Sequence, residues 1–391
     1  MIITRNERAA MKILYVNTTQ GFVGGVERYL HSAADLLSDQ HEAVGLFEHS
    51  LRGYSDFSSV FNQTFLYNEL DEDGRENLAE EVNVAFLHKI SDPELFEWLV
   101  NNFKTILMVH DHDYYCLRHH KYYPFLRINC KRPFQPLVCS LCSGLIEKRK
   151  GRIQPIPLLK RMQILKLARQ TDNQIVLSEF MRENLLKNDF SADKIQKIHP
   201  FYKIQQKKSE KADSSPAQLL FVGQIIRGKG LDQLIDSLQY LKNPYTLSII
   251  GKGNDTAFIQ SLIKKYNLEK RVCLEGWKSN VDEYYSKSDI LIVPSRWQEP
   301  FGLIGMEAFS HHLPVVGFDV GGIGEWLHDE ENGYLVEPGN TRALAKKIDE
   351  LISNPKLREK MGKAGFELVK TEYNQENFVE RFNKLLKELD A

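Results

Sequence analysis

The chain has 391 residues, 42% of them hydrophobic and 26% charged, which is long enough for two globular domains with proper cores. It contains no apolar run of about 18 residues and no signal peptide, which argues against a membrane-spanning helix and predicts a cytoplasmic location. The net charge of -1 hides an uneven distribution. Residues 118–169 carry 13 Lys and Arg against one acidic residue, whereas residues 1–117 carry 8 against 19.

The first half opens with a predicted strand, a glycine loop and a helix. Lys12–Val16 predicts a buried strand, residues 17–25 a loop, and Val26–Leu37 a helix with one apolar face. The free N–H groups at such a helix start suit an anion, but GFVGGVE is not a complete GxGxxG pattern. A phosphate contact and a plain tight turn both remain open. Further strands or helices are predicted at Ala43–Phe47, Val82–Leu87, Pro93–Asn101, Thr105–Val109, Leu158–Arg169, Gln174–Leu177, Glu179–Lys187 and Lys194–Ile198.

A polar cluster, His110-Asp-His112-Asp, follows the strand Thr105–Val109 directly. A histidine at the carboxyl end of a parallel strand is well placed to meet a ligand. A histidine among polar neighbours can also be solvated or hydrogen-bonded to them. The sequence leaves both interpretations open.

Four of the five cysteines come next in the chain. Only the last two have the spacing of a metal-binding knuckle. A structural zinc ion that pins this loop, or reduced cysteines that pack it, are the two interpretations, because disulfides are rare in the cytoplasm. The four residues are Cys116, Cys130, Cys139 and Cys142.

The basic segment, residues 118–169, interleaves its charges with Tyr and Phe. Such a segment suits nucleic acid, an anionic membrane surface, or a solvated face. The sequence has no nucleic-acid-binding motif, so we expect no nucleic acid partner. Peripheral membrane contact through residues 118–169 and a solvated face are the remaining interpretations.

Residues 203–217 are polar and contain Ser-Ser-Pro, which predicts a linker. The α/β pattern restarts after it, so the chain is predicted to form two Rossmann-like domains, residues 1–202 and 218–372. Ligand sites tend to lie in the cleft between such domains. The later strands and helices are predicted at Leu219–Val222, Leu231–Leu241, Thr246–Ile250, Asp255–Tyr266, Arg271–Leu274, Val281–Lys287, Ile290–Val293, Leu313–Val316, Arg342–Ser353, Pro355–Thr371 and Gln375–Leu389.

Several features of the cleft favour a nucleotide ligand. Glycine-rich loops before helices, at residues 21–26 and 223–231, offer backbone donors to phosphate oxygens. Lys229 and Arg227 add positive charge. Glu307 is a carboxylate that suits ribose hydroxyls.

Sequence motifs in the second half carry a family resemblance. FVGQIIRGKG begins at Phe221, and EPFGLIGMEA, from Glu299 to Ala308, contains two glutamates in an E-x7-E arrangement. PVVG, a Gly-Gly pair and NGYLVEPGN follow in order. The first half matches at GGVE and at the strand that ends before His110. With these motifs the chain resembles the retaining glycosyltransferases of family 4 from residue 12 to about residue 370. The resemblance implies an α/β GT-B fold, with two Rossmann-like domains facing across a cleft and a C-terminal helix, residues 373–391, packed back on the N-terminal domain.

The resemblance also implies roles for individual residues. It places Gly24 and Gly25 against the donor's diphosphate and Lys229 on the departing negative charge. It places His110 and Glu299 at the transferred sugar, with His110 on the acceptor side.

The remaining donor contacts follow from the same motifs. Glu307 would bind the ribose. Gln224 stands where the family pattern has Arg, and Arg227 is the cation that could replace it. Backbone N–H groups of three consecutive residues would meet the sugar or phosphate: Phe301, Gly302 and Leu303.

The resemblance implies a retaining, metal-independent hexosyl or N-acetylhexosaminyl transfer without a cofactor. The expected donor is a UDP-sugar, with a GDP-sugar next, and the expected acceptor is a glycan or a lipid-linked molecule in cell-surface polysaccharide or glycoconjugate biosynthesis. Two other functions stay open. A nucleotide-sugar 2-epimerase shares this fold and would change UDP-GlcNAc without an acceptor, whereas a non-catalytic nucleotide-sugar- or glycan-binding module would turn over no donor.

Overall fold

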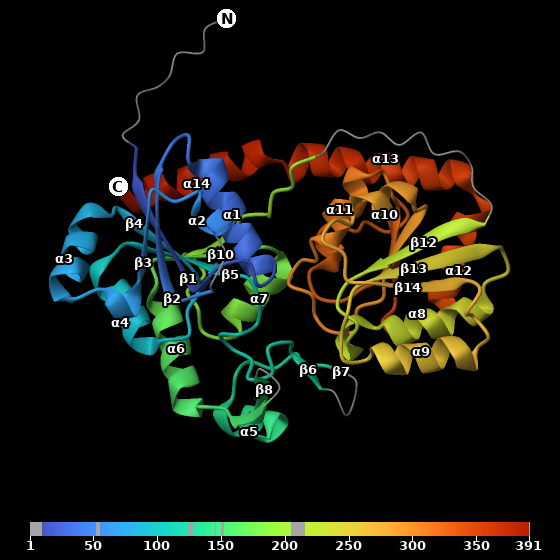
Figure 1. Ribbon diagram of the computed structural model, residues 1–391, viewed down its shortest axis with the longest axis horizontal. Coiled ribbons are helices and arrows are strands. Elements are labelled where there is room, and N and C mark those ends of the chain that lie inside the picture. The colour runs from blue at the N-terminus through green and yellow to red at the C-terminus, as the bar shows by residue number, and fades with distance from the viewer. Residues whose placement is uncertain are drawn as a thin grey trace, which may run out of the picture.

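The chain folds into two α/β domains connected by a long crossing helix (Figure 1). In this computed structural model the predicted linker falls largely outside the described residues, as do residues 1–9 and 150–151. The described residues are 10–51, 55–123, 128–144, 146–149, 152–204 and 216–390.

The first domain is built on a seven-stranded sheet with the order β11-β10-β5-β4-β1-β2-β3. All neighbouring strands are parallel, and the strands are apolar because helices cover both faces. The strands are β1 Lys12–Gln20, β2 Glu42–Ser50, β3 Gln63–Leu66, β4 Val84–Lys89, β5 Thr105–Val109, β10 Asn173–Val176 and β11 Ile195–Lys197. The helices are α1 Gly25–Leu37, α2 Ser55–Ser58, α3 Glu72–Glu81, α4 Pro93–Asn102, α6 Leu158–Gln170 and α7 Glu179–Leu186.

The polar residues 48–81 contain β3 and α3, which the sequence did not predict. Helix α3 buries only Leu78, so it lacks the apolar period that identifies a helix. Its start is held by Asp71, whose side chain accepts a hydrogen bond from the Gly74 N–H at 2.9 Å.

An insert, residues 112–157, projects from the first domain at the bottom of Figure 1. It joins β5 to α6 and consists of two short antiparallel ribbons and one helix. The basic segment therefore spans most of this insert and continues through α6. The elements of the insert are β6 Tyr122–Tyr123, β7 Ile128–Asn129, α5 Pro136–Ser143, β8 Ile146–Arg149 and β9 Arg152–Pro155.

The second domain has a six-stranded parallel sheet with the order β14-β13-β12-β15-β16-β17. Its strands are β12 Ala217–Val222, β13 Tyr245–Ile250, β14 Val272–Gly276, β15 Ile290–Val293, β16 Val315–Phe318 and β17 Gly333–Val336. Its helices are α8 Leu231–Ser237, α9 Thr256–Lys265, α10 Asp282–Lys287, α11 Ile304–Ser310, α12 Thr341–Ser353 and α13 Pro355–Glu372.

The last helix, α14 (Gln375–Asp390), leaves the second domain and lies over the first, in red in Figure 1. The ring of Phe382 lies 4.9 Å from that of Phe86 in β4, and His41 Nε2 is 2.9 Å from Asn383 Oδ1. These two contacts pack α14 of the C-terminal segment against the first domain.

A charged contact also connects the two domains. Glu325 accepts hydrogen bonds from Lys197 at 2.6 Å, His199 at 3.0 Å and the Glu179 N–H at 3.0 Å. Burial opposes ionisation of Glu325, but these donors outweigh it and lower its pKa to about 2. The contact therefore holds a carboxylate at neutral pH.

Candidate active site

The candidate site lies where the strand order of both sheets reverses. In the first sheet this point falls between β1 and β4, and in the second between β12 and β15. Ligands of parallel α/β sheets bind outside the carboxyl ends of the strands at such points. The loop after β1 carries Gly24 and the loop after β12 carries Lys229, while His88 is the next-to-last residue of β4 and Glu299 follows β15.

Glu299 is the best-connected carboxylate of the second domain's site. Its Oε1 accepts from Lys229 Nζ at 2.6 Å, Ser295 Oγ at 2.6 Å and Trp297 Nε1 at 2.9 Å. Burial opposes ionisation of this side chain, which is 7% exposed, but Lys229 and the other donors outweigh it and lower the pKa. The site therefore presents an anchored carboxylate paired with a cation.

Glycines allow the loop of Lys229 to pack closely against the loop before Glu299. A Cβ at Gly228 would lie 2.3 Å from the ring of Trp297. Gly230 has a φ of +68°, and a Cβ there would lie 1.7 Å from the Pro294 carbonyl oxygen. The RGKG sequence is thus required by packing as well as by charge.

Arg227 forms contacts other than with the Lys229–Glu299 pair. Its Nε donates to Asp255 Oδ2 at 3.2 Å, and its guanidinium lies 4.3 Å from the centre of the Phe258 ring. Gln224, where the family pattern has Arg, is exposed. Lys229 is therefore the cation that the structure places beside Glu299.

The segment after Glu299 turns sharply into α11. Phe301 is buried, and its carbonyl oxygen accepts from Trp326 Nε1 at 2.6 Å. Gly302 has a φ of +93°, which favours glycine, and Leu303 immediately precedes α11. This turn sets the direction in which the backbone N–H groups of residues 301–303 point.

Glu307 lies on α11 and is half-buried. Its Oε2 accepts from the Tyr285 hydroxyl at 2.6 Å. Burial raises its pKa, and the Tyr285 hydrogen bond only partly offsets this effect. The two glutamates of the motif therefore occupy different environments, one ion-paired and one hydrogen-bonded to a phenol.

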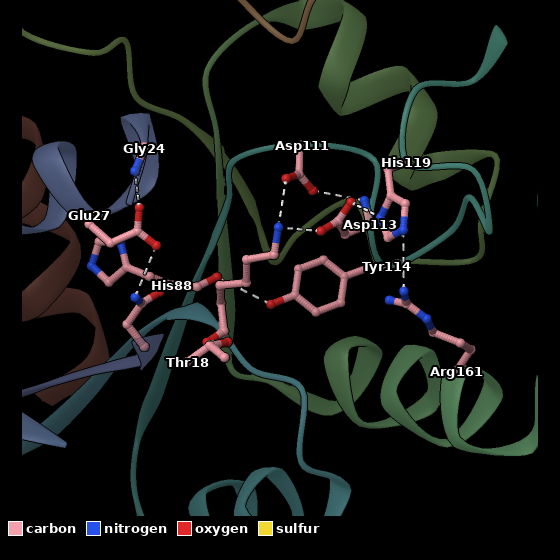
Figure 2. A network of polar contacts seen from close by, with 11 residues as sticks. Thr18, Gly24, Glu27, His88, Asp111, Asp113, Tyr114, His119 and Arg161 are labelled. Carbon is pink, nitrogen blue, oxygen red and sulfur yellow. Dashed lines mark hydrogen bonds and ion pairs between the residues drawn. The ribbon is translucent and has the colours of Figure 1, made fainter. Parts of the chain in front are cut away.

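In the first domain the glycine loop before α1 is capped by an acidic side chain. The Gly24 N–H donates to Glu27 Oε2 at 2.8 Å, and Asn17 Nδ2 lies 3.5 Å from Glu27 Oε1 (Figure 2). Gly24 is thus the N-cap of α1, and its own N–H is already used. A Cβ on Gly25 would meet nothing within 4 Å, so the first turn of the helix is open at that residue.

His110 is paired with a second histidine that the sequence did not single out. His110 Nε2 and His88 Nδ1 are 2.9 Å apart, and their rings stack at 5.1 Å. Burial, followed by the charge of Lys89, lowers the pKa of His110 to about 3, and burial holds the pKa of His88 well below its usual range. Both imidazoles are therefore neutral at pH 7, and a single hydrogen bond connects them.

The two aspartates after His110 hold a charged network (Figure 2). Lys89 Nζ forms ion pairs with Asp111 at 3.3 Å and with Asp113, and Asp113 also contacts His119. Burial, and then Asp113, raise the pKa of Asp111 to about 6, whereas His119 and Lys89 overcome burial and lower the pKa of Asp113. His119 Nε2 in turn lies 3.4 Å from Arg161 of α6.

The insert of the first domain contacts residues of the second domain next to Glu299. His112 Nε2 is 2.9 Å from the Gln298 carbonyl oxygen, and Gln298 Nε2 donates to the carbonyls of Lys121 at 2.7 Å and Cys130 at 2.9 Å. The His120 ring lies 4.0 Å from the ring of Trp297. Neither Gln298 nor His120 could be identified from the sequence, because these contacts join residues far apart in the chain.

All four clustered cysteines line one small cavity of about 30 Å³ in the insert. Among the described residues, no group of three or more His, Cys, Asp or Glu is arranged to hold a metal ion. The zinc site therefore stays a prediction. Burial raises the pKa of the Cys116, Cys139 and Cys142 thiols, which keeps them protonated in this arrangement.

The arrangement of the two domains is also found in solved structures. The Anabaena protein HepE in complex with UDP-glucose superimposes with a TM-score of 0.73, covering 97% of this chain and 100% of that chain at 16% identity. A TarM variant of Staphylococcus aureus, in complex with fondaparinux, alpha-GlcNAc-glycerol and UDP, gives 0.71 over 96% and 99% at 15% identity. The fold is therefore GT-B, as the motif resemblance implies.

The family match lies in the second domain and the segment before it. Residues 203–368 match the family described as glycosyl transferases group 1. An uncharacterized glycosyltransferase of Methanocaldococcus jannaschii is 37% identical over 172 residues, which are 44% of this chain and 48% of the relative. Poly(ribitol-phosphate) alpha-N-acetylglucosaminyltransferase of Staphylococcus aureus is 28% identical over 226 residues, 57% of this chain and 45% of the relative. The chain thus spans about half the length of these relatives, and the matches support a glycosyltransferase of group 1.

Proposed function

We propose that the protein is a retaining glycosyltransferase of family 4 that moves a hexosyl or N-acetylhexosaminyl group from a UDP-sugar to a glycan or lipid-linked acceptor in polysaccharide or glycoconjugate biosynthesis. The observation that carries the proposal is the Lys229–Glu299 pair, 2.6 Å apart, at the switch point of the group 1 domain. The similar structures of HepE and TarM hold UDP or UDP-glucose, which supports a uridine donor.

In this proposal the donor lies along the second domain with its diphosphate at Lys229. Glu307 accepts hydrogen bonds from the ribose, for which its half-buried carboxylate is suited. Glu299 faces the sugar hydroxyls. The N–H groups of residues 301–303 and the open first turn of α1 at Gly25 add donors to the phosphate oxygens.

The transfer proceeds on one face of the sugar. The bond between the anomeric carbon and the diphosphate oxygen breaks, the acceptor oxygen bonds to the same carbon, and the acceptor's proton passes to the departing phosphate. Lys229 offsets the charge that develops on the diphosphate. The chemistry needs neither a metal ion nor a cofactor, because positioning and charge stabilisation come from the chain itself.

The surroundings of Glu299 argue against a glycosyl-enzyme intermediate on this residue. A nucleophilic carboxylate attacks the sugar with electron density that hydrogen-bond donors and a nearby cation reduce. Oε1 of Glu299 is engaged by three donors, and its pKa is lowered, which makes the carboxylate a weaker nucleophile. A positioning role fits these contacts better.

A thermal-shift screen across nucleotide sugars tests the donor. A donor at about 100 times its Kd stabilises the folded chain by about 2.7 kcal/mol, and the best ligand of the screen then enters a transfer assay. Glu299→Ala should lower turnover by orders of magnitude and keep the fold. Near-wild-type turnover in that variant would exclude the role of Glu299, and conversion of UDP-GlcNAc without acceptor would identify an epimerase.

We also propose that the basic segment binds peripherally to the surface of an anionic membrane. Helix α5 exposes Leu137 (83%) and Leu141 (85%) on one face, and α6 exposes Leu159 (82%) beside Lys160. Among the described residues, no helix combines the length and apolarity needed to cross a bilayer. Leu137→Ser together with Leu141→Ser should weaken co-sedimentation with phosphatidylglycerol vesicles at low salt, and unchanged binding would refute the contact.

A further inference from the structure

The first domain contains a cavity of about 800 Å³ that is lined by residues of this domain alone. One end is formed by Thr18, Thr19 and His110, at the carboxyl edge of the sheet. The other end is formed by the first turn of α6 and by the insert. A molecule that places a hydroxyl at His110 therefore extends toward α6.

The charges on the cavity wall are unevenly distributed. The acidic lining residues are Glu27, Asp111 and Asp113. Glu27 accepts a hydrogen bond from the Gly24 N–H, and the two aspartates form ion pairs with Lys89 (Figure 2). The end of the cavity beside the sheet therefore carries a net negative charge, with three carboxylates against the one ammonium group of Lys89.

The α6 end is cationic. Arg118, Lys160 and Arg161 all line it, and Arg161 lies on α6 beside His119 in Figure 2. The first turn of α6 contains no acidic residue, and Pro157 at its N-cap provides no side-chain cap. The N–H groups and the positive helix end therefore add to the side-chain charges. Ile164 supplies an apolar wall beside them.

We propose that the α6 end of this cavity binds a phosphate group of the acceptor while the acceptor's hydroxyl lies toward His110. The inference rests on the proposed glycosyltransferase function and names the class of its acceptor. Two guanidinium groups and one ammonium group suit the oxygens of a phosphate, which carries more charge than a carboxylate. The phosphate belongs either to a soluble ester or to a lipid headgroup.

The test uses the full chain with two phosphate probes, glycerol 3-phosphate in solution and phosphatidic acid in phosphatidylcholine vesicles. Lys160→Ala combined with Arg161→Ala should weaken binding of the recognised probe by about tenfold or more. The matched control is Lys166→Ala, which removes an exposed lysine of the same helix that does not line the cavity. Lys160→Ala alone, which keeps the Arg161–His119 contact, should show a smaller loss in the same direction.

Each outcome distinguishes this inference from the proposed function. Binding of glycerol 3-phosphate supports a soluble ester, and binding of phosphatidic acid alone supports a lipid phosphate. The inference would be overturned if neither probe binds more tightly than its phosphate-free control, glycerol or plain phosphatidylcholine vesicles. Equal losses of binding in the Lys160 and Lys166 variants would also overturn it, even if a UDP-sugar binds. Phosphate binding that depends on Lys160, without binding of any nucleotide sugar, would instead keep the subsite and reject the proposed function.

Discussion

Replacing Glu299 by glutamine separates the structural role of this residue from its role in donor binding. The amide keeps the shape but removes the negative charge opposite Lys229, whose side chain is 21% exposed. Breaking a buried ion pair costs about 3–5 kcal/mol, and the partial exposure of Lys229 reduces this to about 2–3 kcal/mol. At about 2–4 °C per kcal/mol for a domain of this size, the second domain should unfold about 4–12 °C lower in calorimetry.

Donor binding should change in the opposite direction. In the wild-type chain Glu299 competes with a diphosphate for Lys229 and repels its charge, by about 1 kcal/mol at several Å in a partly hydrated site. UDP should therefore bind Glu299→Gln severalfold more tightly in isothermal titration, while sugar transfer falls. Combining Glu299→Gln with Lys229→Met should recover part of the lost stability in a double-mutant cycle. A parallel loss of stability and of UDP affinity would refute the reasoning, because Glu299 would then support the diphosphate instead of competing for Lys229.

Four further outcomes can be measured. Gly25→Ala should keep or slightly raise stability, since its Cβ meets nothing within 4 Å. The same variant should lower UDP-sugar affinity about tenfold if the diphosphate binds at that helix turn. Unchanged affinity would exclude Gly25 from the diphosphate site. Gly228→Ala should cost about 1–3 kcal/mol and reduce transfer, because its Cβ would lie 2.3 Å from the Trp297 ring. The pKa of His110 is lowered to about 3 in the folded chain, so below pH 6.5 the unfolded chain binds more protons than the folded chain. The Tm should therefore fall as the pH drops from 6.5 toward 4, and it should fall less steeply in His110→Asn. If the insert holds zinc, protein grown with zinc should contain one ion per chain and Cys139→Ser should lose it, whereas metal-free protein of equal stability would indicate packed thiols.

The sequence predicts the second domain well because its site lies within one short stretch. Buried strands around Glu299 to Ala308 are continuous apolar runs, and the glycines at positions 228 and 230 are needed for close packing. Local pattern and tertiary contact agree there. The family motifs therefore contain residues that the structure also places side by side, such as Lys229 and Glu299.

The first domain's site was predicted less well because its contacts are not local. His110 was identified from its place at the end of a strand, but its partner His88 comes from a neighbouring strand 22 positions earlier in the chain. Helix α3 was missed because a charged cap, rather than an apolar stripe, defines it. In the second domain, the ion pair of Arg227 with Asp255 could not be predicted from the sequence either, and the donor-binding role of Arg227 stays a prediction.

The insert connects the cavity of the first domain with the loop of Glu299 in the second. It holds the segment before Glu299 through Gln298, so the shape of the donor loop depends on residues that belong to the first domain. The same insert supplies Arg118 and His119 to the cavity that ends at α6. An acceptor bound there would contact the insert, and the insert in turn contacts the loop of Glu299 through Gln298. Under the proposed function, these direct contacts would couple acceptor binding to the geometry of the donor loop. Gln298→Ala should then weaken the effect of acceptor on UDP-sugar affinity in titration while leaving the Lys229–Glu299 pair intact, and an unchanged effect would refute the coupling.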